Sequence, residues 1–331
     1  MQKVKKILST LIATSMLLSM SSQAVLANQL SSDIHESKEL SISAYSDAFP
    51  DAYIEENFID LSDVDLIFKN GTIQSNTSDE IINELIAELN KDPNSISTVR
   101  NSINEGIKIL GVAEATVFVD EEYKEIDGRL QVVNSKLLSK DEVDSISISE
   151  RNPVYNSSEK LTIRLYLLEQ SVSRGVKYAL SGNAYWSGSG LNSTSPASGD
   201  DYMGFTWGGQ HDFSETGIYV FSSNENYPLG GVLADSAPNA SVVYRFEEEC
   251  NNFNHPYHYA NQITIGSTIN KNTLTGQGNT TSVTLKYIHT YTSVKGSLSF
   301  STSSSGSSAG FSLTGVDKQW PLAVTITGLK Y

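Results

Sequence analysis

Three acidic side chains in the second half of the chain have the types and spacing that glycoside hydrolysis uses. Glu247 and Glu249 are two residues apart on an expected strand, so both carboxylates face one side of the sheet. Asp212 can supply a second carboxylate from another strand. Retaining glycosidases hold these groups about 5–5.5 Å apart, whereas alternate strand residues are about 6.5–7 Å apart. A hydrolase using these acids is therefore an alternative hypothesis, and no catalytic residue is assigned in the leading one.

A second candidate chemistry is metal binding. His255 and His258 form an H-x-x-H pair after a run of glutamates, and two imidazoles with one carboxylate make a three-ligand zinc site. Pro256 disfavours the helix on which paired zinc ligands are usually spaced. The adjacent Asp200 and Asp201 are far short of the 6–8 oxygen ligands of calcium. The sequence therefore predicts no cofactor, with a metal at the histidine pair as the alternative.

Aromatic side chains give the leading hypothesis. The three tryptophans and most of the tyrosines lie in the second half of the chain, among Asn, Asp and Gln residues. Rigid aromatic faces beside hydrogen-bonding groups suit sugar rings. We therefore expect a carbohydrate or cell-wall polymer as ligand, bound by Tyr185, Trp186, Tyr202 and Trp207.

Three further features of the sequence are weaker indications of function. The segment 306–310 matches G-x-S-x-G, but no helix follows it, as a nucleophile elbow requires, so we interpret it as a turn. Cys250 has no partner in the chain, which excludes a disulfide scaffold, and we interpret it as structural. The expected hairpin at 295–315 alternates apolar and Ser/Thr residues as pore-forming strands do. Each arm offers only about two apolar positions, so a membrane-active toxin is a further alternative.

The elements that position these residues differ between the two halves. In the first half, Asn70-Gly71 and Asp127-Gly128 predict two-residue hairpin turns. Apolar spacing predicts a helix capped by Ser78, and a second helix that follows Pro93 and runs to Gly111. Ser139-x-x-Glu142 is a capping box for a third, short helix. Helices beside hairpins predict an acidic α+β unit.

In the second half, apolar residues recur with the two-residue period of β-strands. Alternating apolar residues, separated by Gly, Ser, Thr and Asn, predict ten strands near 161–170, 175–186, 202–208, 217–222, 241–248, 262–269, 282–292, 296–302, 309–314 and 321–330. Crossover helices are missing from this half, which excludes a parallel α/β sheet. The expected fold class is thus an α+β N-terminal domain followed by an all-β domain, an antiparallel β-sandwich that resembles a jelly roll.

Length and charge complete the domain organisation. The 331 residues carry a net charge of −15, which argues against nucleic acid as the partner. A basic start, an apolar run and Val25-Leu26-Ala27 predict a signal peptide at 1–27, too short for a stable membrane anchor. We expect a flexible polar segment at 28–48, an acidic α+β domain at 49–150 and a Ser/Asn/Tyr-rich β-sandwich at 151–331. The leading prediction is a secreted, non-enzymatic binding protein in the extracellular medium.

Overall fold

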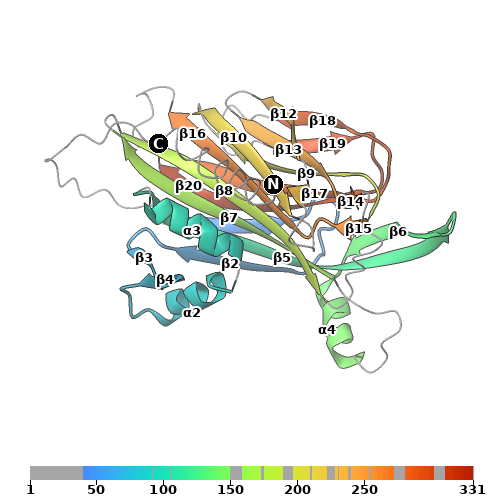
Figure 1. Ribbon diagram of the computed structural model, residues 1–331, viewed down its shortest axis with the longest axis horizontal. Helices are drawn as coiled ribbons and strands as arrows, with labels where there is room; N and C mark the ends of the chain where they lie inside the picture. Colours follow the sequence, from blue (N-terminus) through green and yellow to red (C-terminus); the bar gives the residue numbers. More distant parts are fainter. Residues whose placement is uncertain are drawn as a thin grey trace, which may run out of the picture.

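The computed structural model describes residues 40–91, 93–104, 106–149, 159–172, 175–188, 197–208, 211–221, 228–229, 231–237, 240–252, 255–271, 280–301 and 310–330. Two antiparallel sheets lie face to face and contain most of these residues (Figure 1). The predicted signal peptide and the 306–309 part of the G-x-S-x-G motif lie outside the described residues. Within the described part of the chain, no helix has the length and apolar character needed to cross a membrane.

The first sheet has six strands. Their order across the sheet is β1 (Ser41–Tyr45), β20 (Gln319–Lys330), β17 (Thr280–Thr290), β9 (Asp200–Trp207), β13 (Ser241–Glu247) and β12 (Val232–Ala237). Its outer face carries the hairpin of β18 (Ser297–Ser301) and β19 (Gly310–Thr314), which packs on Tyr202, Val243 and Ile288.

The second sheet has eight strands. Their order is β11 (Pro228–Leu229), β10 (His211–Phe221), β16 (Gln262–Lys271), β8 (Gly175–Gly188), β7 (Glu159–Val172), β5 (Lys108–Ile126) and β2 (Ile54–Asp60), and β6 (Arg129–Leu137) pairs with the far end of β5. A separate ribbon joins β14 (Glu249–Asn252) to β15 (His255–Tyr259). The ten strands predicted in the second half are all present, and the sandwich-like antiparallel fold is confirmed.

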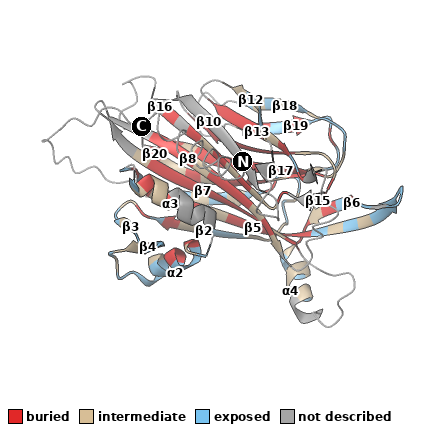
Figure 2. Cartoon of the chain, in the orientation of Figure 1, coloured by how far each residue is buried: buried red, intermediate tan, exposed pale blue. Residues whose placement is uncertain are grey.

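The core lies between the two sheets because the strands alternate. On β7, Leu161, Ile163, Leu165 and Leu167 are fully buried and belong to the main core, while Arg164 between them faces the other side. Trp186, Trp207 and Trp320 lie in the same core. Figure 2 shows this buried band across the sheets, in contrast to the exposed end of the β5–β6 arm.

The strand pairing corrects the expected domain boundary. β5 and β7 pair from Val119↔Glu159 to Lys108↔Glu169, so the chain on the two sides of residue 150 forms one sheet. β1 pairs with the last strand, β20, and therefore 41–45 is an edge strand rather than part of a flexible segment. The halves before and after residue 150 share both sheets and one core, and an independent α+β core is not seen among the described residues.

A small helical layer covers the outer face of the larger sheet. It contains the hairpin of β3 (Leu66–Lys69) and β4 (Thr72–Ser75), followed by α2 (Glu80–Leu89) and α3 (Pro93–Asn104) (Figure 1). Buried residues of this layer pack on Tyr166, Leu168 and Ala179 of β7 and β8. The predicted turn is confirmed, because Asn70 and Gly71 both have positive φ, at 54° and 81°.

Two helix boundaries differ from the predicted ones. α2 is capped by Asp79 and not Ser78, since the Asp79 carboxylate accepts the backbone N–H groups of Ile81 and Ile82. α3 ends at Asn104, and the chain enters β5 at Lys108 instead of remaining helical to Gly111. Gly106, with a φ of +69°, terminates the helix, and the following apolar residues take the period of a strand.

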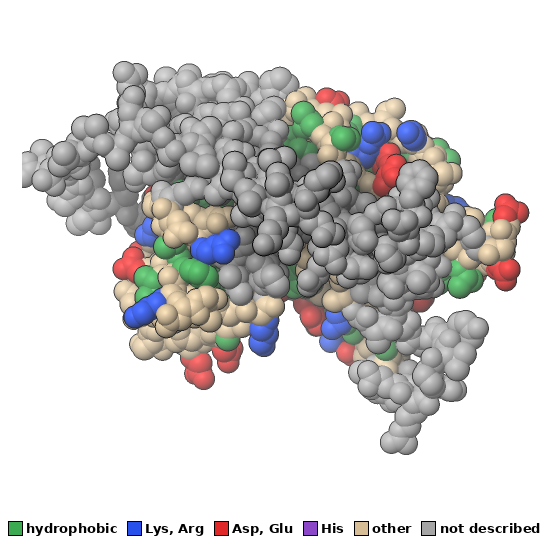
Figure 3. Space-filling model, viewed as in Figure 1, with side chains coloured by type: hydrophobic (Ala, Val, Ile, Leu, Met, Phe, Trp, Pro, Cys, Tyr) green, Lys and Arg blue, Asp and Glu red, His purple; other side chains and the backbone are tan. Residues whose placement is uncertain are grey.

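Many acidic side chains of the first half lie on the surface. Figure 3 shows them at the tip of the β5–β6 arm, on the right of the view, and below α2. The arm ends in the Asp127-Gly128 turn, whose positive φ angles of 53° and 78° confirm the second predicted hairpin. Asp120, Glu122 and Glu125 are exposed along this arm. Much of the acidic charge of the first half therefore lies on solvated surface.

The predicted capping box is present at α4 (Lys140–Ser149) and gives a first testable prediction. Glu142 accepts the Ser139 backbone N–H at 2.8 Å and pairs with Lys136 at 2.7 Å. The Lys136 hydrogen bond, followed by those from Ser139, lowers the pKa of Glu142 to about 2. We expect Glu142→Gln to cost about 0.5–1 kcal/mol at pH 7, because a capping contact that is half exposed is screened by solvent.

The pH dependence provides the check. A carboxylate with a lowered folded pKa contributes its full stability above its unfolded pKa of about 4.3, and loses it as the pH falls toward 2. The difference in urea midpoint between wild type and Glu142→Gln should therefore shrink between pH 5 and pH 2.5. Asp141→Asn is the matched control and should show a smaller difference. A Glu142→Gln difference that is equal at both pH values would contradict the assignment.

Candidate functional site

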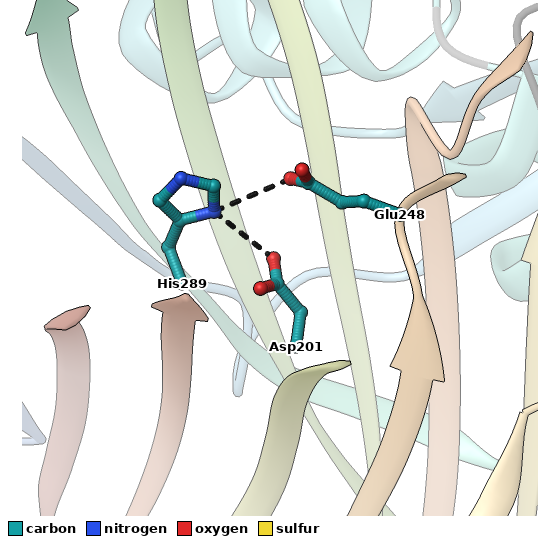
Figure 4. Close-up of side chains that lie close together, drawn as sticks. All are labelled: Asp201, Glu248 and His289. Atoms are coloured by element: carbon teal, nitrogen blue, oxygen red, sulfur yellow. Dashed lines mark hydrogen bonds and ion pairs between the residues drawn. The ribbon is translucent and has the colours of Figure 1, made fainter. Parts of the chain in front are cut away.

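A histidine surrounded by acidic side chains lies between the sheets. His289 near the end of β17, Asp201 near the start of β9 and Glu248 after β13 converge at the same end of the six-stranded sheet, and Figure 4 shows their side chains pointing toward one another. His289 Nδ1 is 3.2 Å from Asp201 Oδ2 and 3.3 Å from Glu248 Oε1. The three side chains are no more than 1% exposed. We call these three residues the His–carboxylate cluster.

The opposite sheet adds a third carboxylate. Glu121 on β5 places Oε1 3.4 Å from His289 Nε2, and its side chain is 2% exposed. Its other oxygen accepts the hydroxyl of Tyr123 at 2.7 Å, and this hydroxyl is 3.4 Å from Glu159. Both ring nitrogens of His289 therefore face carboxylates, Nδ1 within its own sheet and Nε2 across to the other sheet.

Asp201 is held by the chain around it. Its Oδ1 accepts the Thr290 backbone N–H at 2.7 Å, and its Oδ2 accepts the Tyr287 hydroxyl at 2.5 Å. The hydroxyl of Tyr287 in turn accepts the Trp186 ring N–H at 3.2 Å. The orientation of the Asp201 carboxylate is thus fixed by two donors before any ligand binds.

Tryptophan rings enclose the cluster. The ring centroids of Trp320 and Trp186 lie 4.9 Å and 5.2 Å from the His289 ring, and Trp320 donates its ring N–H to Ser135 at 2.9 Å. Apolar rings around charged groups lower the local dielectric constant, so the electrostatic interactions within the cluster are stronger than at a surface.

The electrostatics follow from this burial. Burial and then the neighbouring charge of Asp201 raise the pKa of Glu248 well above its usual value. Burial lowers the pKa of His289, but Asp201 and Glu248 outweigh that effect and raise it well above 6.5. The cluster therefore favours positive charge at its centre, which a proton on the imidazole or a metal cation can supply. Asp201, Glu248 and His289 each offer one ligand atom, all within 4.8 Å of one another.

A pocket opens on the outer side of the same strands. It has a volume of about 290 Å³ and lies where the ends of β9, β13 and β17 meet the β18–β19 hairpin. Asp200 and Glu247 are direct partners across β9 and β13, and both line it. Arg245 lies 3.4 Å from the Asp200 carboxylate. The other lining residues are Ser198, Gly199, Tyr202, Thr290, Ser293, Val294, Lys295 and Leu313.

The four aromatic residues predicted to bind a ligand lie in different environments. Trp186 and Trp207 are 3% and 1% exposed and belong to the core, so neither presents a face to a ligand from solvent. Tyr202 lines the pocket but is only 4% exposed. Tyr185 is half-buried on the outer face of the larger sheet, where the Arg164 guanidinium lies 5.5 Å above its ring. A continuous aromatic binding face is therefore not formed by these four residues.

The three acids considered for glycoside hydrolysis do not come together either. Glu247 is exposed in the pocket, but Glu249 begins β14 rather than continuing the strand of Glu247. Asp212 lies on β10 of the other sheet. The residue that lies opposite Glu247 is Asp200, which the sequence suggested as a calcium ligand or a hydrogen-bonding group and not as a catalytic acid.

The remaining predicted residues lie on the ribbon and the hairpin. His258 stands opposite Cys250, and His255 opposite Asn252, in the β14–β15 pairing; the side chains of these residues lie outside what the structure describes. In the 295–315 segment, Phe311 and Leu313 are buried in the cluster with Val243 and Ile288. The apolar positions proposed to face lipid thus contact the protein's own sheet.

Sequence reasoning missed His289 as a functional candidate. Val283, Leu285 and Tyr287 occupy alternate, inward-facing positions of β17, and His289 continues this series. A histidine at the next inward position of an apolar strand is a detectable signal. Glu121 carries no such signal, because charged residues flank it on an exposed arm.

The fold and these sites define an antiparallel β-sandwich with a buried His–carboxylate cluster and a polar outer pocket. No protein-family model and no curated protein matches the chain. Among solved structures, the N-terminal domain of the Streptococcus gordonii adhesin Sgo0707 aligns over 88% of this chain and 84% of its own, with 8% identity and a TM-score of 0.16. A likeness at that score supports no inference about this chain.

Proposed function

We propose that this protein is a secreted binding protein without enzymatic activity, and that it holds a carbohydrate group of a cell-surface or environmental polymer in the outer pocket. The observation that supports this proposal is the lining, which combines the carboxylates of Asp200 and Glu247 with the hydroxyls of Ser198, Thr290 and Ser293. Carboxylates accept hydrogen bonds from sugar hydroxyls, and serine or threonine hydroxyls both donate and accept. The signal peptide predicted at 1–27 supports the secreted part of the proposal.

The pocket's size limits the ligand. About 290 Å³ is close to the lower end of the ~300–1,000 Å³ range of small-molecule sites. Since Tyr202 is almost fully buried, it offers little open ring surface for stacking. We therefore propose recognition of one sugar unit or a chain end by hydrogen bonds, and not stacking along an extended polymer.

Depletion from solution tests this proposal. Purified protein is mixed with insoluble polysaccharides and bacterial cell walls, and the unbound fraction is measured. We expect saturable depletion by one polymer and an affinity at least tenfold lower for Glu247→Gln, because loss of a charged hydrogen-bond acceptor costs about 1.5–3 kcal/mol. Glu80→Gln on the exposed start of α2 is the control. Absence of depletion by every polymer, or equal binding by Glu247→Gln, would refute the proposal.

The register of β9 and β13 favours one second candidate, glycoside hydrolysis. Directly opposed residues on antiparallel strands have Cβ atoms about 4.5–5.5 Å apart, and Asp200 and Glu247 are such a pair. Retaining enzymes hold their two carboxyl groups about 5–5.5 Å apart, a separation that side chains starting from such Cβ positions can reach. Release of reducing ends that is lost in both Asp200→Asn and Glu247→Gln would favour hydrolysis over simple binding.

A further inference from the structure

We propose that the His–carboxylate cluster binds a divalent transition-metal ion of the zinc type, with Asp201, Glu248 and His289 as ligands and Glu121 as the residue that positions the histidine. This site is separate from the outer pocket and does not depend on the proposed carbohydrate binding. The ligands are one imidazole nitrogen and two carboxylate oxygens, a set that zinc uses.

The distances between the ligand atoms fit this ion. Zinc binds histidine nitrogen and carboxylate oxygen at about 2.0–2.2 Å. In a tetrahedron with bonds of that length, neighbouring ligand atoms are about 3.3–3.5 Å apart. His289 Nδ1 is 3.2 Å from Asp201 Oδ2 and 3.3 Å from Glu248 Oε1, so the nitrogen has nearly this spacing to each oxygen, and the three ligand atoms all lie within 4.8 Å of one another. A water molecule or a second carboxylate oxygen can take the fourth position.

Glu121 provides an independent observation. Its Oε1 is buried without a hydrogen bond among the described residues, and it points at His289 Nε2 from 3.4 Å. If Nδ1 binds a metal, the ring proton is on Nε2 and points at this oxygen. Metal-binding histidines nearly always donate their second ring N–H in this way, frequently to a carboxylate. The otherwise unused Glu121 oxygen thus has a role that matches a metal on the other side of the ring.

The charge balance of the interior also favours a cation. Asp201, Glu248 and Glu121 surround one imidazole, so negative charge is in excess even when the ring is protonated. Burying unbalanced charge is energetically costly. A dication between Asp201 and Glu248 neutralises two of the three carboxylates at the point where they converge.

The site would connect the two layers of the sandwich. Asp201 and His289 belong to the six-stranded sheet, whereas Glu121 belongs to β5 of the eight-stranded sheet. A metal on Asp201, Glu248 and His289 would join three separate segments of the chain, and a hydrogen bond from His289 Nε2 to Glu121 would connect them to the other sheet. Binding only in the folded state would raise stability with metal concentration.

The test uses the full chain, purified without chelators, dialysed against excess Zn²⁺ and then freed of unbound ion. We expect one zinc per chain by elemental analysis and a melting temperature that rises with zinc concentration. His289→Gln should retain less than a tenth of the zinc. The double variant His255→Gln/His258→Gln, which alters the histidine pair singled out by sequence, should retain all of it.

Glu121→Gln keeps the proposal testable if His289→Gln does not fold. It leaves the three ligands in place, and we expect its zinc affinity to fall about 10–100-fold with an unchanged circular dichroism spectrum. A purely structural glutamate would not change zinc affinity in this way. Wild-type protein without bound zinc, zinc retained by folded His289→Gln, zinc lost from the double variant, or unchanged affinity of Glu121→Gln would each overturn the proposal.

Discussion

Replacing Trp186 with alanine is expected to lower the free energy of unfolding by about 3–5 kcal/mol, the cost of deleting a large buried aromatic side chain. Trp186 is 3% exposed, and its ring packs edge-on against Trp320 and Tyr287, at 6.0 and 6.4 Å between centroids. The substitution also removes the donor to the Tyr287 hydroxyl, and thereby a support of Asp201. Urea unfolding at pH 7 measures the effect.

The adjacent Tyr185→Ala is the matched control. Tyr185 points to the opposite face of β8 and is half-buried, so we expect less than half of the Trp186 effect. The comparison separates a core tryptophan from a ligand-binding one. A Trp186→Ala variant that is as stable as wild type but fails to bind carbohydrate would restore the binding role that the sequence suggested for it.

Alternation along a strand explains why the sequence could not distinguish a core tryptophan from a ligand-binding one. Tyr185 and Trp186 are adjacent, so the sequence correctly predicts that they face opposite sides of the sheet. It does not reveal which side is covered by a second layer. The six-stranded sheet covers the Trp186 side, and the strands that form it lie elsewhere in the chain.

Local signals in the sequence correspond well to local structure. The hairpin turns at Asn70-Gly71 and Asp127-Gly128 and the capping box at Ser139 are all present, because each depends on a few neighbouring residues. The predicted end of α3 is wrong because local signals do not decide it. Ile107 fits a helical and a strand period equally well, and only the pairing of β5 with β7 decides between them.

Long-range pairing could not be read from the sequence, and the candidate site depends on it. Asp201, Glu248 and His289 come from segments tens of residues apart, and Glu121 from a strand beyond the expected domain boundary. Glu248 is buried and Glu247 is exposed, as alternation along a strand requires. The residues that Glu248 contacts depend on which strands pair and in which register. A single sequence does not specify this for strands that are far apart in the chain.

Removing the charge of Asp201 is the second substitution with a large expected effect. Asp201→Asn is expected to destabilise the protein by about 3–5 kcal/mol, as breaking a buried ion pair does. The carboxylate is fully buried and accepts three donors, from Thr290, Tyr287 and His289. An amide of the same shape can accept at one atom only, so at least one of these donors faces an N–H group and loses its acceptor.

The neighbouring Asp200→Asn separates this network from a general effect of charge. Asp200 lies on the outer side of β9, and its partner Arg245 is 38% exposed, so we expect a change below about 1 kcal/mol. Urea unfolding of both variants in the presence of a chelator reports the network alone, because a bound metal would add its own contribution. Equal effects of the two substitutions would mean that Asp201 stabilises the sandwich no more than an ordinary surface carboxylate does.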